Sequence, residues 1–145
     1  MNKRQRKKQQ WKQDEREWKA YSDSLKKLPV WYWKYGIHDA KILDVSELKN
    51  GVDKKRGKYY RNCLALTLNS SGAIYETNIK KIIFYNYEVK MSDAPISQLS
   101  QTWWMGDTIE RLSNLNYLLN FEVDPENGER WNFSIEFEYI DVERR

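Results

Sequence analysis

Hydrophobic and polar residues alternate from Tyr117 to Tyr139, with a polar break in the middle. Alternation with a period of two is typical of a strand that buries one face. The break, Asp124 to Gly128, is rich in turn-forming residues, so the two arms predict a β-hairpin. The apolar face of the arms consists of Tyr117, Leu119, Phe121, Val123, Trp131, Phe133, Ile135, Phe137 and Tyr139.

The same alternation predicts the register of this hairpin. A two-residue Asn127-Gly128 turn would place apolar side chains opposite polar ones, for example Val123 opposite Asn132. A three-residue loop, Glu126 to Gly128, instead keeps apolar residues opposite apolar ones, and each such pair contributes roughly 0.2–1 kcal/mol. We therefore expect the pairs Val123–Trp131, Phe121–Phe133, Leu119–Ile135 and Tyr117–Phe137.

Further strand patterns precede the hairpin, separated by turn-forming residues. The third of them is one long strand or a bent pair. Its middle, Ile82 to Tyr85, is apolar on both faces and should lie centrally in the sheet. A loop with a short helix near Asp93 follows it. The predicted strands cover residues 37–48, 58–68, 73–90 and 108–112.

Near the start of the chain, large apolar residues recur at helical spacing. Trp11, Trp18 and Leu25 are seven residues apart, which predicts an amphipathic helix over residues 11–28 that ends before Pro29. Burying one such large side chain contributes roughly 1.5–3 kcal/mol. We therefore expect the apolar stripe of this helix to pack on the sheet.

Together these patterns predict a mainly β (α+β) protein. Consecutive strands with short turns favour an antiparallel meander that forms a curled sheet, a sandwich or a partly open barrel, with the helix packed on it. Residues 1–10 are nearly all Lys, Arg and Gln and predict a flexible basic arm. Residues 11–145 are expected to form a single domain, with its sheet within 37–142.

The net charge of +4 is unevenly distributed. Residues 1–27 carry ten Lys/Arg against four Asp/Glu, and residues 28–106 carry eleven against seven. Residues 107–145 reverse this balance, with four against ten. A basic beginning and an acidic end can bind each other, or each can bind a partner of opposite charge.

Three glutamates share the polar face of the predicted hairpin: Glu122 on one strand, and Glu136 and Glu138 on the other. Such a group could hold a hard cation or act as acid and base, as a carboxylate-based hydrolase would require. Glutamates on an exposed strand are more often solvated and discourage edge-to-edge aggregation. The interpretation that we favour is an acidic patch for a basic partner protein, and we expect no metal or cofactor.

Two basic clusters support an alternative, a nucleic-acid-binding protein. Binding would require both clusters on one surface, with exposed aromatic residues for base stacking. The nearby aromatic residues also suit a core, and no RNA-binding or helix-turn-helix signature is present. The clusters are Lys3, Arg4, Arg6, Lys7 and Lys8 in the arm, and Lys54, Lys55, Arg56 and Lys58 in a loop.

Other candidate residues favour structural roles. His38 and Asp39 suggest a general base, but neighbouring side chains on a strand point to opposite faces, so we expect no hydrogen-bonded dyad. The single Cys63 is expected to be buried, excludes an internal disulfide and suits the cytoplasm. No Gly-rich phosphate loop, Gly-x-Ser-x-Gly turn or apolar run of membrane-spanning length is present. We therefore expect neither an enzyme nor a membrane partner.

One arrangement of residues resembles a known group of proteins. Trp31 precedes Gly36-Ile-His-Asp-Ala40, a meander follows, and Gly106-Asp-Thr-Ile-Glu110 comes before the terminal hairpin. This layout is similar to small uncharacterised bacterial proteins, some of which resemble the immunity proteins encoded beside toxins. The resemblance implies a non-catalytic protein-interaction module that blocks a basic, nucleic-acid-cleaving toxin. It implies nothing about the oligomeric state.

Overall fold

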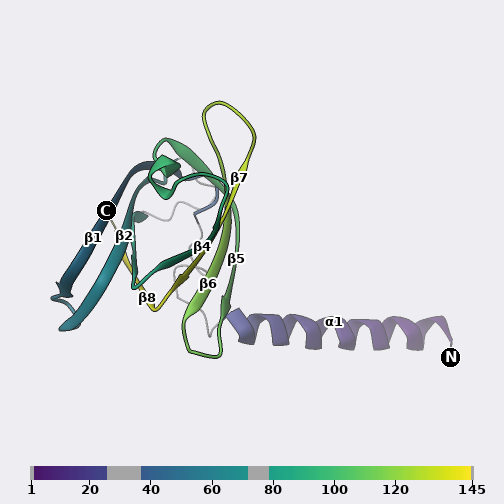
Figure 1. The fold of residues 1–145 in the computed structure, drawn as a ribbon. Helices are drawn as coiled ribbons and strands as arrows, with labels where there is room; N and C mark the ends of the chain where they lie inside the picture. Colours follow the sequence, from purple (N-terminus) through teal and green to yellow (C-terminus); the bar gives the residue numbers. More distant parts are fainter. Residues whose placement is uncertain (1, 26–36, 72–78, 145) are drawn as a thin grey trace.

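The computed structural model of the chain describes residues 2–25, 37–71 and 79–144. These residues form a long helix that extends away from a curled antiparallel β-sheet (Figure 1). The predicted mainly β fold is thereby confirmed. The elements are α1 (Lys3–Leu25), β1 (Lys41–Asp53), β2 (Lys58–Asn69), β3 (Ile79–Tyr85), β4 (Glu88–Ser92), the 3₁₀-helix η2 (Ile96–Leu99), β5 (Thr102–Arg111), β6 (Tyr117–Asp124), β7 (Trp131–Phe137) and β8 (Tyr139–Arg144).

The eight strands of the described residues lie in the order β4-β7-β6-β5-β1-β2-β3-β8. Strands β3 and β4 are two parts of one bent segment, and β7 and β8 are two parts of another. Tyr85 pairs with Tyr139 on one side of the bends, and Glu88 pairs with Glu136 on the other. Between these pairs, the backbone N–H of Glu138 donates to the carbonyl of Tyr85 at 3.0 Å. The sheet therefore curls until its two bent segments run side by side.

The C-terminal hairpin has the register that the alternation predicts. Each of the four expected apolar pairs, from Tyr117–Phe137 to Val123–Trp131, is present. The loop is longer than the predicted three residues, because pairing stops at Val123–Trp131 and β6 ends before Pro125. Proline has no backbone N–H to donate, so it lies beyond the ladder.

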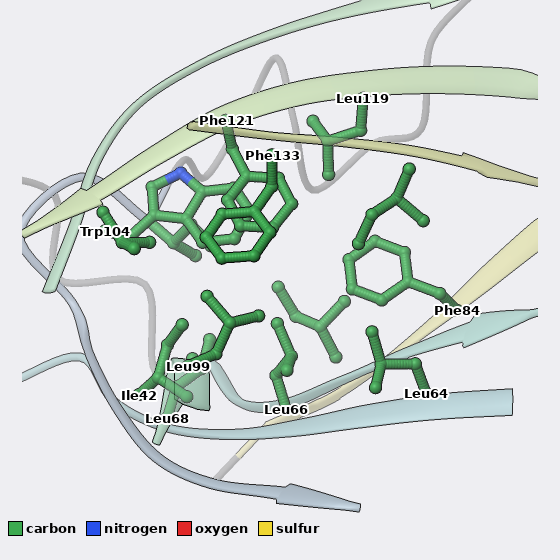
Figure 2. Close-up of a cluster of buried hydrophobic side chains, with 14 of the residues drawn as sticks. Ile42, Leu64, Leu66, Leu68, Phe84, Leu99, Trp104, Leu119, Phe121 and Phe133 are labelled. Carbon is green, nitrogen blue, oxygen red and sulfur yellow. The ribbon is translucent and has the colours of Figure 1, made fainter. Parts of the chain in front are cut away.

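The inner face of the curled sheet encloses one hydrophobic core (Figure 2). Phe121 lies at its centre on the hairpin side, with its ring 4.3 Å from that of Trp104 and 5.3 Å from that of Phe133. All three rings are nearly parallel, and aliphatic side chains of β2 face them across the core. Aromatic stacking of this kind adds about 0.5–1.5 kcal/mol per pair to the burial of the rings.

The long apolar segment before Asp93 is a bent pair, one of the two forms that the sequence predicts. It bends at Asn86 and Tyr87, between β3 and β4. Strand β3 pairs along both edges, with β2 and β8, so it lies inside the sheet as its apolar middle predicts. The short helix expected near Asp93 is η2.

Two strands, β1 and β5, have limits that differ from the prediction. Residues 37–40 form a turn, closed by the Ala40 N–H donating to the Ile37 carbonyl at 2.9 Å, so β1 begins at Lys41. Strand β1 then continues to Asp53, because it pairs with β2 as far as Asp53–Lys58. Strand β5 is also longer than predicted and begins at Thr102, which pairs with Ile42 of β1.

Helix α1 begins at Lys3 and not near Trp11. The reason is a reciprocal cap: the Gln5 N–H donates to Oδ1 of Asn2 at 2.9 Å, and the Asn2 N–H donates to Oε1 of Gln5 at 3.2 Å. Residues 3–17 do not pack on the sheet as predicted, because all their side chains are exposed. Trp11, the first residue of the predicted apolar stripe, is 65% exposed. The predicted residues 26–28 and the segment 29–36 lie outside the described residues.

Candidate protein-binding face

A groove of about 490 Å³ lies on the outer face of the sheet, across β4, β5, β6 and β7. Side chains alternate along a strand, so the residues between the buried positions of the hairpin point outward. We call this feature the outer groove. Its lining consists of Met91, Gly106, Asp107, Thr108, Asn120, Phe121, Glu122, Asn132, Phe133 and Ser134.

The described residues that line the groove are mixed, with Met91 and parts of Phe121 and Phe133 beside polar side chains. They include two carboxylates, those of Asp107 and Glu122, and neither Lys nor Arg. The hydroxyl of Ser134 donates to Oδ1 of Asn120 across the β6–β7 pair, so the floor of the groove is internally hydrogen-bonded. Most small-molecule pockets are lined by apolar side chains. An open groove that presents carboxylate, amide and hydroxyl side chains is better suited to a polar or charged segment of another macromolecule.

Gly106 makes room for one of these carboxylates. The β5–β6 register shifts between Trp104 and Gly106, and the carboxylate of Glu122 lies against the glycine. A Cβ atom at position 106 would lie 2.8 Å from Oε1 of Glu122, so any side chain there would push the carboxylate aside. The other carboxylate is fixed from the core, because the buried Trp104 donates its Nε1–H to Oδ2 of Asp107 at 2.6 Å.

The three glutamates predicted from sequence lie along the hairpin but do not converge. Glu122 pairs in register with Asn132, and Glu136 lies four residues further along β7, which separates the two by roughly 13 Å. Glu138 lies at the bend between β7 and β8. One cation cannot bridge groups at this spacing. Among the described residues, no three His, Cys, Asp or Glu side chains are grouped so that they could hold a metal ion.

Each predicted glutamate has a local partner. Arg130 Nη1 lies 3.4 Å from Oε1 of Glu122. The side-chain amide of Asn116 donates to Glu136 at 3.0 Å. The side-chain amide of Asn86 donates to Glu138 at 2.7 Å. Two of the three partners are neutral amides, which orient the carboxylates of Glu136 and Glu138 without neutralising their charge.

Arg130 offsets part of the acidic charge at the loop end of the hairpin. Its Nε lies 2.7 Å from Oδ1 of Asp124, and this hydrogen bond holds the pKa of Asp124 below its usual value. The same pairing raises the pKa of Arg130. The acidic surface therefore has a neutralised end at Asp124 and a more strongly negative end near Glu136 and Glu138.

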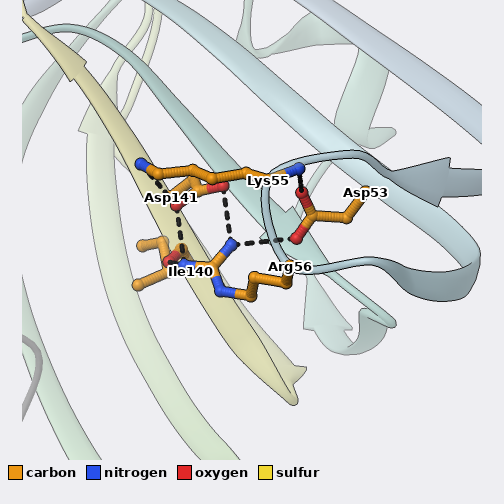
Figure 3. Close-up of polar contacts among 5 residues, drawn as sticks. All are labelled: Asp53, Lys55, Arg56, Ile140 and Asp141. Atoms are coloured by element: carbon orange, nitrogen blue, oxygen red, sulfur yellow. Dashed lines mark hydrogen bonds and ion pairs between the residues drawn. The ribbon is translucent and has the colours of Figure 1, made fainter.

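The basic loop predicted to bind nucleic acid has a structural role at its central residue (Figure 3). Arg56 contacts Oδ2 and Oδ1 of Asp141 through Nη1 and Nη2, both at 2.8 Å, and Oδ2 of Asp53 at 3.0 Å. Its guanidinium also lies over the Tyr139 ring, 4.8 Å from the centroid. The hydrogen bond to Asp141 is the largest of the effects that raise the pKa of Arg56 above its usual value.

The two predicted basic clusters lie in separate environments. Lys55 lies 3.8 Å from Oδ1 of Asp141, and Lys58 lies over the Tyr139 ring at 5.5 Å, so both face β8. The basic residues Lys3, Arg4, Arg6, Lys7 and Lys8 instead lie in α1, which extends away from the sheet on the side opposite the β1–β2 turn (Figure 1). The nucleic-acid hypothesis required both basic clusters on one surface. The two clusters lie on separate parts of the molecule, so this requirement is not met.

His38 and Asp39 correct a further expectation. They lie in the turn before β1 and not on a strand, and Asp39 has a left-handed φ of 69°. Their side chains consequently point the same way, with Nδ1 of His38 3.2 Å from Oδ1 of Asp39. Both side chains are exposed to solvent by more than a third, so they form a surface pair.

Sequence reasoning missed the outer groove and the Arg56 contacts. The groove could have been found, because Asn120, Asn132 and Ser134 occupy the positions between the apolar residues of the hairpin. The contact of Arg56 with Asp141 left no sequence signal, since 85 residues separate the two. Cys63 is buried in β2, as expected, and burial raises the pKa of its thiol.

Comparison with known proteins adds no relative to this description. Within the described part of the chain, no helix has both the length and the apolarity that crossing a bilayer requires. Protein-family models, curated proteins and solved structures give no match to the chain.

Proposed function

We propose that this protein is a non-catalytic binding module of the immunity or antitoxin type. Its outer groove and the adjoining glutamates of the hairpin bind a basic surface of another protein in the cytoplasm. The observation that carries this proposal is the set of described residues that line the groove: two carboxylates and several uncharged hydrogen-bonding side chains, with Arg130 as a cation beside Glu122 at one end.

The arrangement of charge suits a basic partner. The groove lies on paired strands, which hold the positions of its side chains, so little conformational entropy is lost when a partner binds. Glu136 and Glu138 extend the negative charge beyond the groove along the same segment. Complementary charge of this kind raises the association rate and selects against acidic partners. A toxin that cleaves nucleic acid needs a basic surface for its substrate, and this acidic face would compete for that surface.

A defined basic probe tests the proposal. We would measure association of a fluorescent Lys/Arg-rich peptide by stopped flow, at low and at physiological salt. The variant Glu122→Gln/Glu136→Gln/Glu138→Gln should slow association by tenfold or more at low salt and have little effect at high salt.

A matched variant separates this face from the overall charge of the protein. Asp14→Asn/Glu15→Gln/Glu17→Gln removes the same number of negative charges from exposed positions of α1. It should leave the association rate nearly unchanged. Equal slowing by both variants would show that the peptide responds only to net charge, and the proposal would be rejected.

A further inference from the structure

We infer that the first two and a half turns of α1 form an arm that binds the phosphate backbone of a nucleic acid. This inference does not depend on the outer groove. It also differs from the prediction made from the sequence, in which the arm and the basic loop bind nucleic acid together. The arm consists of residues 3–11 and does not need the β1–β2 turn, where Arg56 is held by Asp53 and Asp141.

The density of positive charge in the arm matches that of phosphates in a duplex. Five cations lie within residues 3–8, which rise by roughly 7.5 Å along the helix axis. That is one cation per about 1.5 Å, close to the one phosphate per about 1.7 Å of duplex DNA. All described side chains of the arm are exposed, so these cations are accessible.

The cations also share one side of the helix. At about 100° per residue, all five fall within an arc of about 200°, and Gln5 and Gln9 occupy the remaining side. Trp11 lies within the basic arc and is 65% exposed, which places an aromatic ring beside the cations for contact with a base or sugar. Asp14 and Glu15 follow on the same side and end the basic surface.

Other anionic partners fit this arm less well. A helix that lies in a membrane surface needs a broad apolar face, and Trp11 is the only large apolar residue between positions 3 and 17. An interface with an acidic protein normally has an apolar centre, which the arm also lacks. Lys, Arg and Gln side chains are the common donors to phosphate and sugar oxygens.

The charge pattern of α1 is unfavourable for a helix without a partner. Its first turn contains no acidic residue, so Lys3, Arg4 and Arg6 lie at the positive end of the helix dipole. Lys3 and Lys7, and Arg4 and Lys8, are like-charged pairs at a spacing of four residues. Phosphates bound there would relieve both repulsions, so binding should stabilise the helix of the arm against unfolding.

The test uses the full chain and duplexes of DNA and RNA of about 20 base pairs, with affinity measured by fluorescence anisotropy between about 50 and 200 mM salt. The variant Lys3→Gln/Arg4→Gln/Arg6→Gln/Lys7→Gln/Lys8→Gln should reduce the slope of log affinity against log salt by up to about 4. The matched variant Lys49→Gln/Lys54→Gln/Lys58→Gln/Lys80→Gln/Lys90→Gln should change this slope by less than about 1. Circular dichroism should show that binding raises the temperature at which the helical signal is lost, in the wild type only.

Several results would overturn the inference. These are an undetectable affinity for both duplexes at low salt, equal slopes for the two variants, or equally tight binding of poly-glutamate. The inference would also be overturned if the wild type associated with itself and if two variants lost this association. These are the five-fold variant of the arm and Glu122→Gln/Glu136→Gln/Glu138→Gln. That result would assign the arm to the acidic hairpin of a second copy.

Discussion

Arg56 and Asp141 join the turn of the β1–β2 hairpin to the last strand of the sheet. The two terminal nitrogens of Arg56 lie 2.8 Å from the two carboxylate oxygens of Asp141, in a planar, two-point contact (Figure 3). Asp53, at the base of the same turn, binds Nη1 of the same guanidinium at 3.0 Å. The guanidinium therefore fixes the first hairpin of the sheet against its final strand, and charge-assisted hydrogen bonds of this geometry are the strong ones.

Replacing Arg56 should weaken the fold. Arg56→Gln removes the contacts to Asp141 and leaves the buried carboxylate of Asp53 without its guanidinium partner. We expect a loss of roughly 1–3 kcal/mol in the free energy of unfolding, measured by urea denaturation. Lys54→Gln, which removes the same charge from the same turn, should change it by less than about 0.5 kcal/mol. A loss that is no larger for Arg56→Gln than for Lys54→Gln would contradict this role.

The free energy of unfolding should decrease in acid, in part because of Arg56. Burial raises the pKa of Asp53, but hydrogen bonds from Arg56 and from the Lys55 N–H outweigh it, so the net pKa is lowered. The pKa of Asp124 is lowered as well, by Arg130. A carboxyl group whose pKa is lower in the folded than in the unfolded state stabilises the fold at pH values above its unfolded pKa of about 4. This stabilisation is lost as the pH falls through the folded pKa.

The pH dependence of unfolding tests this sign. Urea midpoints of the wild type should decline as the pH falls below about 4. Arg56→Gln should be less stable than the wild type at neutral pH and should decline less in acid, because Asp53 then lacks the guanidinium that lowers its pKa. Parallel declines of the two proteins would show that the pairing with Arg56 does not lower the pKa of Asp53.

The side chain of Asn62 in β2 binds the backbone of Tyr87, just beyond the end of β3, where the β3–β4 segment turns away from β2. Its side-chain amide donates to the Tyr87 carbonyl at 3.0 Å, and its Oδ1 accepts the Tyr87 N–H at 2.9 Å. Asn62→Ala would leave both backbone groups of a buried residue without these partners and should cost roughly 1–3 kcal/mol in urea denaturation. Asn62→Asp keeps the acceptor and should cost less. Asn127→Ala, in the exposed hairpin loop, is the neutral control.

Phe121 tests the hairpin on which the sheet is built. It is buried between Trp104 and Phe133, so Phe121→Ala should destabilise the protein by roughly 3–5 kcal/mol. The adjacent Asn120 points to the outer groove, and Asn120→Ala should cost less than about 1.5 kcal/mol, the worth of one hydrogen bond. Similar losses at both positions in thermal or urea unfolding would contradict the assignment of inner and outer faces.

The sequence predicted those features that depend on neighbouring residues. The register of the C-terminal hairpin followed from alternation alone, because one slipped residue would have exposed Phe121 and Phe133. The start of α1 was readable from Asn2 and Gln5, a capping pair at a spacing of three, but the apolar stripe that begins at Trp11 drew the prediction away from it.

Features that depend on distant contacts could not be predicted. Arg56 was grouped with its basic neighbours because nothing near it in the sequence indicates Asp141. Packing of α1 on the sheet was inferred from the cost of exposing Trp11, yet this side chain is exposed. His38 and Asp39 were assigned to a strand, whereas a turn held by the Ile37 carbonyl brings their side chains together.

The most direct test of the proposed function is a nuclear magnetic resonance titration of the labelled protein with the Lys/Arg-rich peptide. The proposal predicts the largest amide shifts at Gly106, Asn120, Glu122, Asn132 and Ser134, and their loss in Glu122→Gln/Glu136→Gln/Glu138→Gln. Gly106→Ala, which displaces the Glu122 carboxylate, should weaken the same shifts. Shifts scattered over the surface, or confined to residues outside β4–β7, would contradict a binding role for the outer groove.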